Sequence, residues 1–386
     1  MALRILHSGD FHLGAPLRSL PPEVAEAVRG SLKSAVERMF AAAVERGVEM
    51  LVFTGDLFEQ DGEDPAAQLR FIYQLADSVA PVPVVITPGN HDPVFADSPY
   101  STIAWPDNVV LFNNGSFTVR ETAVGPVAGR AVMAGEGTGA LDWSQLPPPG
   151  DGPALLALHA SLMRAGDGRQ NRNTCAPVTL ETLQQCGYSY IALGHYHRFQ
   201  TWTHQSGGIL AAYPGCPQGQ GWDEPGEKSC LVVDIDPGGA AIEEMPLSER
   251  VWHKANLNLP PEHAADSDTR LLTALQEIYD ELGAQDLLRL SVHGRWPRDR
   301  RTALEEKVAD VTKRAWHAEA VDYSAVDFHP PLVAAGDSEV LDEFLDICEA
   351  GSGQATGDAG EVAAWQLARY LGQRLLSGQG LPEEVA

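Results

Sequence analysis

Short apolar runs that stop abruptly at Gly, Asp, Asn or His are the feature that most limits how this chain can fold. Each run has four to six residues, mostly aliphatic or β-branched, as expected of strands buried on both faces. The predicted strands are Arg4–His7, Met50–Thr54, Val82–Thr87, Arg130–Ala134, Ala154–Leu158, Tyr190–Leu193 and Ile209–Tyr213. Helical patterns over Glu23–Arg46 and Pro65–Ser78 separate the first three strands. This alternation predicts an α/β layered sheet with right-handed crossovers.

The pattern changes after about residue 250. Strands and helices there predict a compact α+β unit: Val251–Leu259, Asp268–Leu282, Leu287–His293, Arg300–Arg314 and a short strand near Glu319–Tyr323. Two more helical patterns, Glu339–Glu349 and Glu361–Leu376, flank a Gly-rich loop. We therefore predict a first domain at residues 1–248, an α+β cap at 249–332 and a helical C-terminal segment at 333–386.

Cysteine usage and the N-terminal sequence bear on the compartment. The five cysteines are scattered, odd in number and never form CxxC, which argues against a disulfide framework and a structural zinc knuckle. The N-terminal residues lack the basic region, the long apolar region and the cleavage site of a signal peptide. The apolar stretches are too short to span a bilayer. The sequence therefore predicts a soluble cytoplasmic protein without a membrane segment.

Five short polar motifs stand at the ends of predicted strands. They are Asp10-Phe11-His12, Gly55-Asp56, Gly89-Asn90-His91-Asp92, His159 and Gly194-His195-Tyr196-His197. Sites in open α/β sheets form where strands end and loops begin, so these residues are expected to meet. The Asp-x-His and His-x-His pairs each share one face, because the strand period is two. Mixed carboxylate and imidazole ligands suit Mn²⁺, Fe²⁺ or Zn²⁺ better than Ca²⁺.

Two metal ions would account for both the number and the kinds of these residues. Two cations about 3.5–4 Å apart would hold a bridging hydroxide and clamp a phosphoryl group for in-line attack on phosphorus. Asp56 suits the bridging position because a carboxylate has two oxygens, and Asn90 adds a neutral carbonyl oxygen. His91 follows Asn90 directly without an obvious ligand role. It is therefore the candidate for assisting the leaving oxygen with a proton.

The motif order DxH, GD, GNH, H and GHxH resembles the signature of the calcineurin-like metallophosphoesterases. The resemblance implies a layered metallophosphoesterase sandwich, with central β-sheets flanked by helices. It implies that the first metal takes Asp10, His12, Asp56 and His197, and that the second takes Asp56, Asn90, His159 and His195. It also implies that His91 is the catalytic histidine.

A finer resemblance, to the SbcD-type DNA repair exonucleases, covers most of residues 1–235. The segments that carry it are GDLF at Gly55–Phe58, YIALGHYH at Tyr190–His197 and YPGCP at Tyr213–Pro217. The resemblance implies Mn²⁺ as the working metal, 3′→5′ exonuclease activity and some single-strand endonuclease activity. It also implies a cap that positions DNA and a C-terminal segment that docks on an SbcC-like coiled-coil SMC-type ATPase. Such proteins often form homodimers, although the sequence identifies no dimer surface.

Several polar residues near or outside these motifs have a less defined role. Glu59 stands three residues after Asp56, at a position where the resembled proteins more usually have His or Asp. Cys216 stands where those proteins usually have Ser. Neither is an expected ligand, so both bear on substrate choice. Asp92 either helps to shape the site or is a turn residue before Pro93. The remaining histidines lack partners at ligand spacing and are interpreted as structural or surface residues: His7, His204, His253, His263, His293, His317 and His329.

Two arginine-containing segments are candidates for DNA contact. In the first, RWPRDRR, Arg295 and Arg298 could neutralise phosphates and Trp296 could stack on a base. A solvated turn leading into a helix is an equally good interpretation of this segment. In the second, RAGDGRQNR, the arginines follow His159 closely enough to reach a substrate near the metals; they are Arg164, Arg169 and Arg172.

The net charge keeps other functions open. The chain has 27 Lys and Arg against 53 Asp and Glu, a formal charge of −26, which repels polyanions at long range. From Pro331 onward there are ten acidic residues and two basic ones, so part of the excess acid lies away from the motifs. The leading interpretation is a two-metal DNA nuclease. The alternatives are a phosphodiesterase of a small or nucleotide substrate, and a non-catalytic scaffold subunit of an SMC-like ATPase complex.

Overall fold

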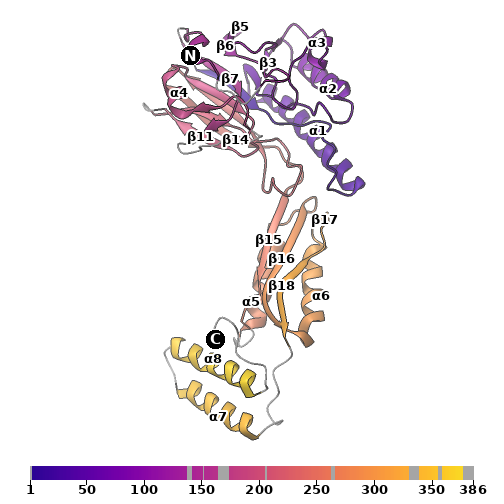
Figure 1. Cartoon of the computed structure of the whole chain (residues 1–386), viewed down its shortest axis with the longest axis vertical. Helices are drawn as coiled ribbons and strands as arrows, with labels where there is room; N and C mark the ends of the chain where they lie inside the picture. Colours follow the sequence, from indigo (N-terminus) through magenta and orange to yellow (C-terminus); the bar gives the residue numbers. More distant parts are fainter. Residues whose placement is uncertain are drawn as a thin grey trace. The chain divides into compact units, whose positions relative to one another are not determined.

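The computed structural model describes residues 2–136, 141–150, 152–163, 174–204, 207–261, 266–329, 339–354 and 359–376. It divides into two compact units, Met1–Trp252 and His253–Ala386 (Figure 1). The predicted boundary between residues 332 and 333 falls outside the described residues. Both units mix helices and strands, as the sequence predicts.

Among the described residues of the first unit, twelve strands form one sheet in the order β4-β3-β2-β1-β13-β14-β12-β10-β7-β6-β5, with β11 paired to β12. One half contains four parallel strands: β1 (Leu3–Ser8), β2 (Met50–Phe53), β3 (Val84–Ile86) and β4 (Val109–Leu111). The other half contains β5 (Thr118–Thr122), β6 (Gly125–Gly129), β7 (Leu155–His159), β10 (Tyr190–Gly194), β11 (Gln200–Thr203) and β12 (Ile209–Tyr213). The hairpin of β13 (Ser229–Asp236) and β14 (Gly239–Pro246) joins the two halves.

The two halves of this sheet pack face to face. Alternate residues along the strands point into one central cluster, which contains Ile5 and Val52 from the first half and Leu155 and Tyr190 from the second. The intervening residues face outward, where Leu6 joins a separate cluster with the helices. The helices of the first unit are α1 (Pro22–Glu45), α2 (Pro65–Ser78), α3 (Pro99–Thr102), α4 (Leu180–Gln185) and the 3₁₀ turn η1 (Trp143–Gln145). The predicted α/β sandwich is therefore confirmed.

One predicted strand, Arg130–Ala134, is wrong. The strand ends before it, at Gly129, as the second arm of the β5–β6 hairpin. Arg130 is buried, and its guanidinium donates to the carbonyl of Gly115 and to Glu136. These side-chain hydrogen bonds hold the segment in place of the backbone hydrogen bonds of a β-sheet. The apolar pattern of this segment reflects burial of a turn. A further short pair, β8 (Leu162–Met163) and β9 (Val178–Thr179), lies outside the main sheet.

The second unit contains a small α+β layer. Its elements are β15 (Trp252–Asn258), α5 (Ser267–Glu281), β16 (Leu287–Pro297), the 3₁₀ turn η2 (Arg298–Arg300), α6 (Arg301–Thr312), β17 (His317–Ala318) and β18 (Asp322–His329). Strands β16 and β18 are parallel, as the crossover through α6 requires. Leu271 of α5 and Val308 of α6 pack with Val292 and Trp296 of β16 in one cluster, so both helices cover the same core.

A helical hairpin follows, formed by α7 (Glu339–Gln354) and α8 (Ala359–Leu376) (Figure 1). Glycines allow the two helices to approach closely. A Cβ at Gly351 would lie 2.4 Å from the ring of Trp365, and one at Gly372 would lie 2.1 Å from the ring of Phe344. Each helix thus inserts an aromatic ring against a glycine of the other. No helix in the described ranges is long and apolar enough to cross a membrane.

His7 on β1 is a buried structural histidine, as the sequence predicts. Its Nδ1 lies 2.8 Å from the hydroxyl of Tyr190, and its Nε2 lies 3.2 Å from Oγ1 of Thr54. Both neighbours are polar and uncharged, and His7 is completely buried. Burial lowers the pKa of His7 from 6.5 to about 3, so the folded protein keeps this ring neutral.

We predict that His7 makes the fold sensitive to acid. Below pH 6.5 the unfolded chain binds a proton at His7 that the folded protein does not, so stability falls as pH decreases towards 3. From this group alone, unfolding free energy should drop by about 2 kcal/mol between pH 8 and pH 5. Urea unfolding of metal-free wild type and His7→Gln across this range should show the difference. Equal pH slopes for the two proteins would contradict the prediction.

Candidate metal centre

The five polar motifs converge at one edge of the first unit. Strands β1, β2 and β3 are parallel, so the loops that follow them lie at the same edge of the sheet. Strands β7 and β10 are also parallel and deliver the remaining motifs. The structure brings together the seven predicted ligands and the predicted catalytic histidine: Asp10, His12, Asp56, Asn90, His91, His159, His195 and His197.

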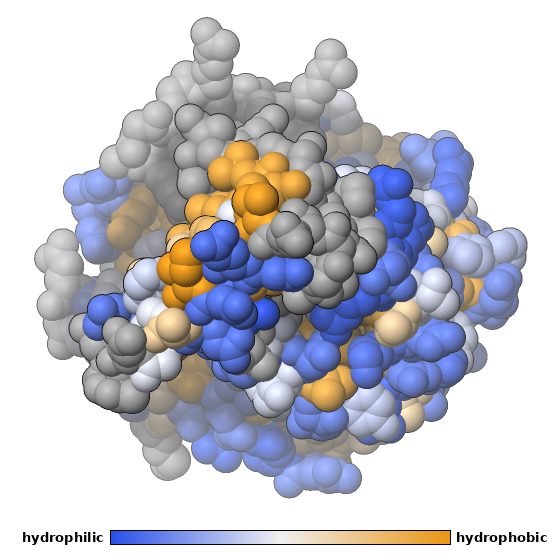
Figure 2. Space-filling model, turned by 90° about the horizontal axis from the view of Figure 1, so that it is seen from below, coloured by the Kyte–Doolittle hydropathy of each residue, from blue (hydrophilic) through white to orange (hydrophobic). Residues whose placement is uncertain are grey.

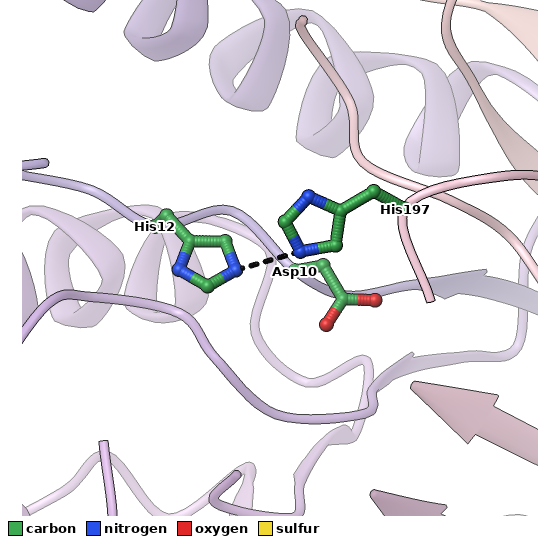
Figure 3. A group of neighbouring side chains, drawn as sticks. All are labelled: Asp10, His12 and His197. Atoms are coloured by element: carbon green, nitrogen blue, oxygen red, sulfur yellow. Dashed lines mark hydrogen bonds between the residues drawn. The ribbon is translucent and has the colours of Figure 1, made fainter. Parts of the chain in front are cut away.

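Asp10, His12 and His197 form the first group (Figure 3). The Nε2 atoms of His12 and His197 face each other at 3.0 Å, and the carboxylate of Asp10 lies beside them. One potential ligand atom from each residue lies within 4.8 Å of the others. This spacing suits a single cation held by two imidazoles and a carboxylate.

Asp56, His159 and His195 form the second group. The side-chain oxygen of Asn90 lies between the two rings, 2.9 Å from Nε2 of His159 and 3.1 Å from Nδ1 of His195. His159 and Asp56 are almost fully buried. The group therefore offers imidazole nitrogens, one carboxylate and one neutral oxygen, which suits a transition-metal ion.

Asp56 lies where it can serve both groups. Its Oδ2 is 3.7 Å from Nε2 of His12 in the first group and 3.3 Å from Nε2 of His159 in the second. Its Oδ1 accepts a hydrogen bond from the backbone N–H of His91 at 2.8 Å. One oxygen is thus fixed by the backbone while the other faces both sets of imidazoles.

The imidazole rings are oriented by acceptors on their outer nitrogens. The Nδ1 of His12 faces Glu59 at 2.7 Å, that of His159 faces the carbonyl of Thr54 at 2.8 Å, and that of His197 faces Glu224. A proton held at Nδ1 leaves the lone pair on Nε2 free to bind a metal. The Nδ1 contacts therefore turn the Nε2 atoms of three rings towards the ligand groups, the direction that metal ligation requires.

The backbone at the site is strained. Asp10, His12, Asp56 and His195 have φ angles of 53°, 50°, 52° and 115°, in the region that non-glycine residues avoid. Such conformations persist only where surrounding contacts enforce them. The backbone N–H of His195 donates to both carboxylate oxygens of Asp10 at 3.0 Å, and the N–H of His12 donates to the carbonyl of Asp56 at 2.8 Å. The motif loops thus fix one another.

Asp92 shapes the site, one of the two roles considered for it. One oxygen accepts from the N–H groups of Asp56 and Gly89, and the other accepts from the N–H of Leu57 and the hydroxyl of Tyr100. This buried carboxylate therefore joins the loops after β2 and β3. The loops are so close that a Cβ at Gly89 would lie 2.2 Å from Oδ1 of Asp56.

Burial and charge compete within the site. Burial raises the pKa of the Asp10 carboxyl. Burial also acts upward on Asp56, but the nearby His159 outweighs it and holds the pKa of that carboxyl well below its usual range. Burial opposes charge on His159 and His197, yet the carboxylates facing them raise each pKa to about 9. Without metal these two rings hold protons at neutral pH, which a cation would have to displace.

Two residues of the site have roles that the sequence did not indicate. Glu224 contacts His197 and accepts a hydrogen bond from the N–H of Gln220 at 2.8 Å, but it belongs to none of the five motifs. Its place shortly after the YPGCP turn is the local signal that could have pointed to it. Glu59, expected to bear on substrate choice, contacts His12 and His91.

Of the two arginine-containing segments predicted to contact DNA, the structure describes only the one in the second unit. Arg164, Arg169 and Arg172 fall outside the described residues. Arg295 pairs with Asp327 at 3.0 Å, and Arg298 donates to the carbonyl of Phe328 at 3.2 Å. The suggested stacking of Trp296 on a base is wrong, because this side chain is 1% exposed in the core of the second unit.

Comparison with known proteins agrees with the geometry. A family model described as calcineurin-like phosphoesterase matches residues 3–199, which include every predicted ligand. The chain is also similar to the uncharacterized metallophosphoesterase YhaO of Bacillus subtilis (strain 168). The two are 25% identical over 314 residues, which cover 76% of this chain and 72% of YhaO.

We predict that Asp92→Asn weakens metal binding. The amide would turn an NH₂ group towards N–H or O–H donors, so the Asp56 loop should shift and the protein should lose about 1–3 kcal/mol of stability. Metal affinity should fall about tenfold or more. Calorimetric titration with Mn²⁺ and urea unfolding measure the two effects. Tyr100→Phe, which removes one of the four donors, should have a smaller effect; unchanged Mn²⁺ affinity in Asp92→Asn would contradict the prediction.

Proposed function

Since the chain belongs to the calcineurin-like phosphoesterase family, we propose that it is a two-metal phosphodiesterase that acts on DNA as a nuclease. The observation that carries the two-metal part is the position of Asp56. Its Oδ2 lies within 4 Å of an imidazole nitrogen from each of the two ligand groups. A carboxylate shared in this way suits a pair of cations better than one.

Each cation would have a defined set of ligands. The first would be held by Asp10, His12, Asp56 and His197, and the second by Asp56, Asn90, His159 and His195. When bound, two divalent cations would polarise the phosphoryl oxygens and activate water for in-line attack. The mixture of carboxylate, amide and imidazole donors supports Mn²⁺, with Fe²⁺ or Zn²⁺ as alternatives.

His91 is the proposed proton donor to the leaving oxygen. Its side chain is 45% exposed beside the buried ligands, so it can reach a bound phosphodiester. Nδ1 faces Glu59 at 3.0 Å, which leaves Nε2 for the substrate. The hydrogen bond to Glu59 raises the pKa of His91, which favours the protonated ring that an acid requires.

DNA is the proposed substrate class because of the SbcD-like segments GDLF, YIALGHYH and YPGCP. The α+β layer of the second unit supports it, since a small substrate would not require such a unit. The activity would be 3′→5′ exonucleolytic, with some cleavage of single strands, in DNA repair. A nucleotide or other small phosphodiester is the second candidate, which the net charge of −26 favours.

We predict that His91→Ala lowers hydrolysis about 10²–10⁴-fold, because the leaving oxygen loses its proton donor. Wild type, His91→Ala and the control His317→Ala, from the second unit, would be incubated with Mn²⁺ and end-labelled duplex DNA, and with a chromogenic diester. The nuclease proposal expects DNA degradation by wild type and control alone. If the wild type hydrolyses the chromogenic diester but leaves DNA intact, the nuclease proposal is wrong and the small-substrate function takes its place. If it hydrolyses neither substrate, the result favours a non-catalytic scaffold.

The α7–α8 hairpin is the proposed docking site for an SbcC-like coiled-coil SMC-type ATPase. Several apolar side chains on it are exposed, notably Val340 at 63%, Ile347 at 56% and Leu375 at 53%. Figure 2 shows hydrophobic side chains (orange) beside hydrophilic ones (blue) on the face that it views. The charged residues of α7 are all acidic, so a partner helix with basic flanks would complement this surface. A homodimer is the second proposed assembly, and it rests on the SbcD-like resemblance alone.

We predict that Val340→Glu with Ile347→Glu abolishes binding to such an ATPase from the same organism while leaving diester hydrolysis intact. The added charges would be buried without partners on docking. Val44→Glu, at a site 60% exposed on α1, is the control and should bind normally. Size-exclusion chromatography and calorimetry measure binding. Equal affinities for all three proteins would contradict docking through the hairpin.

A further inference from the structure

One group of potential cation ligands in the described residues contains a cysteine. Cys216, His197 and Glu224 each offer one ligand atom, and these three atoms lie within 4.8 Å of one another. The Sγ of Cys216 is 3.7 Å from Oε2 of Glu224, whose Oε1 faces Nδ1 of His197. Glu224 thus brings the group to the Nδ1 side of the His197 ring, whereas Nε2 of this ring faces His12 (Figure 3).

Contacts between loops hold the thiol and the carboxylate in place. Cys216 is 1% exposed and follows β12 in the YPGCP turn. This turn packs directly on the chain at His197, because a Cβ at Gly215 would lie 3.0 Å from the carbonyl oxygen of His197. Glu224 is fixed by the backbone N–H of Gln220, which donates to its Oε2 at 2.8 Å. The group therefore needs little rearrangement to receive a cation.

We propose that Cys216, His197 and Glu224 form a binding site for Zn²⁺ that inhibits the enzyme when it is occupied. A thiolate, an imidazole and a carboxylate are ligands that zinc takes in proteins. A thiolate also favours Zn²⁺ over the harder Mn²⁺, which binds most weakly among the first-row divalent cations. Cys216 and Glu224 lie outside residues 3–199, to which the family model is matched, and outside the five motifs.

The inhibition would arise because two cations need the same ring. A neutral imidazole has one nitrogen with a free lone pair and one N–H. The first cation of the proposed pair needs the lone pair on Nε2 of His197, with the proton on Nδ1 facing Glu224. Zn²⁺ held with Glu224 and Cys216 would take the lone pair on Nδ1 and leave the proton on Nε2. Zinc binding would thus remove one ligand from the first cation.

The group is open enough for a cation to enter. The side chain of His197 is 33% exposed and that of Glu224 is 13% exposed, so solvent reaches the group past these two residues. Cys216 binds a cation as the thiolate, so the cation must displace the thiol proton. Zn²⁺ does this more readily than Mn²⁺, because its affinity for sulfur is higher. The site would therefore respond to zinc while Mn²⁺ occupies the neighbouring ligands.

A first experiment detects the thiolate ligand without substrate. Co²⁺ replaces Zn²⁺ as the probe, because cobalt bound to a thiolate has an intense charge-transfer band in the near ultraviolet. The seven predicted ligands of the other two cations contain no sulfur, so Co²⁺ held by them lacks this band. Metal-free, full-length wild type, Cys216→Ser and Cys186→Ser would be titrated with Co²⁺. Cys186→Ser is the matched control, because this thiol belongs to none of the potential cation sites in the described residues.

We expect the charge-transfer band in wild type and in Cys186→Ser, and its loss in Cys216→Ser. If Cys216→Ser does not fold, Cys216→Ala decides the result. A wild type without the band in excess Co²⁺ would overturn the inference, and so would a band that remains in Cys216→Ser.

A second experiment tests inhibition, and this part of the inference rests on the proposed phosphodiesterase function. Hydrolysis of the chromogenic diester would be followed at saturating Mn²⁺ while Zn²⁺ is added, with the rate in Mn²⁺ alone as the reference for each protein. The Zn²⁺ concentration that halves the rate should be about tenfold or more higher in Cys216→Ser than in wild type, because one protein ligand is lost. Cys186→Ser should match wild type.

Equal sensitivity of wild type and Cys216→Ser to Zn²⁺ would overturn the inhibitory role. Failure of the proposed function is distinguishable from this result. A wild type that hydrolyses no phosphodiester refutes the function, while the Co²⁺ spectra still test whether Cys216 binds a cation.

Discussion

Asp56 is the residue on which the rest of the site depends. It is buried, and its pKa is held low although burial acts in the opposite direction, so the protein must stabilise a negative charge away from water. The surrounding loops do this. The N–H of His91 donates to the Asp56 carboxylate, the carboxylate of Asp92 fixes the Asp56 backbone, and imidazoles from both ligand groups face the free oxygen. A cation pair would complete this arrangement by replacing the protons on the imidazoles.

The order of the strands explains why such a site can form. The ligands come from two halves of a sheet that are far apart in sequence, and β13 joins these halves by pairing with β1, for example Leu3 with Ile235. No local pattern encodes that pairing. The ligands themselves could be predicted, because each follows a short buried strand and the parallel strands end at one edge. The sequence therefore predicts which residues form the site better than it predicts how β13 joins the two halves of the sheet.

The contacts around the ligands were harder to predict for a related reason. Glu59 and Glu224 contact histidines that are distant in sequence, and a lone Glu carries no spacing that marks it as their acceptor. Arg130–Ala134 looked like a strand because burial alone produces an apolar pattern. Trp296 was predicted to stack on a base because it stands among arginines, but on β16 its side chain points into the core of the second unit. In each case a long-range contact decided the role.

The central proposal is that Asp56 would be a ligand of two metal ions. Calorimetry combined with electron paramagnetic resonance of the Mn²⁺-loaded protein tests it most directly. The account predicts two Mn²⁺ per wild-type chain with the spectrum of a magnetically coupled pair, and loss of that coupling with much weaker binding in Asp56→Asn. A single Mn²⁺ in the wild type, or a coupled pair that survives in Asp56→Asn, would contradict it.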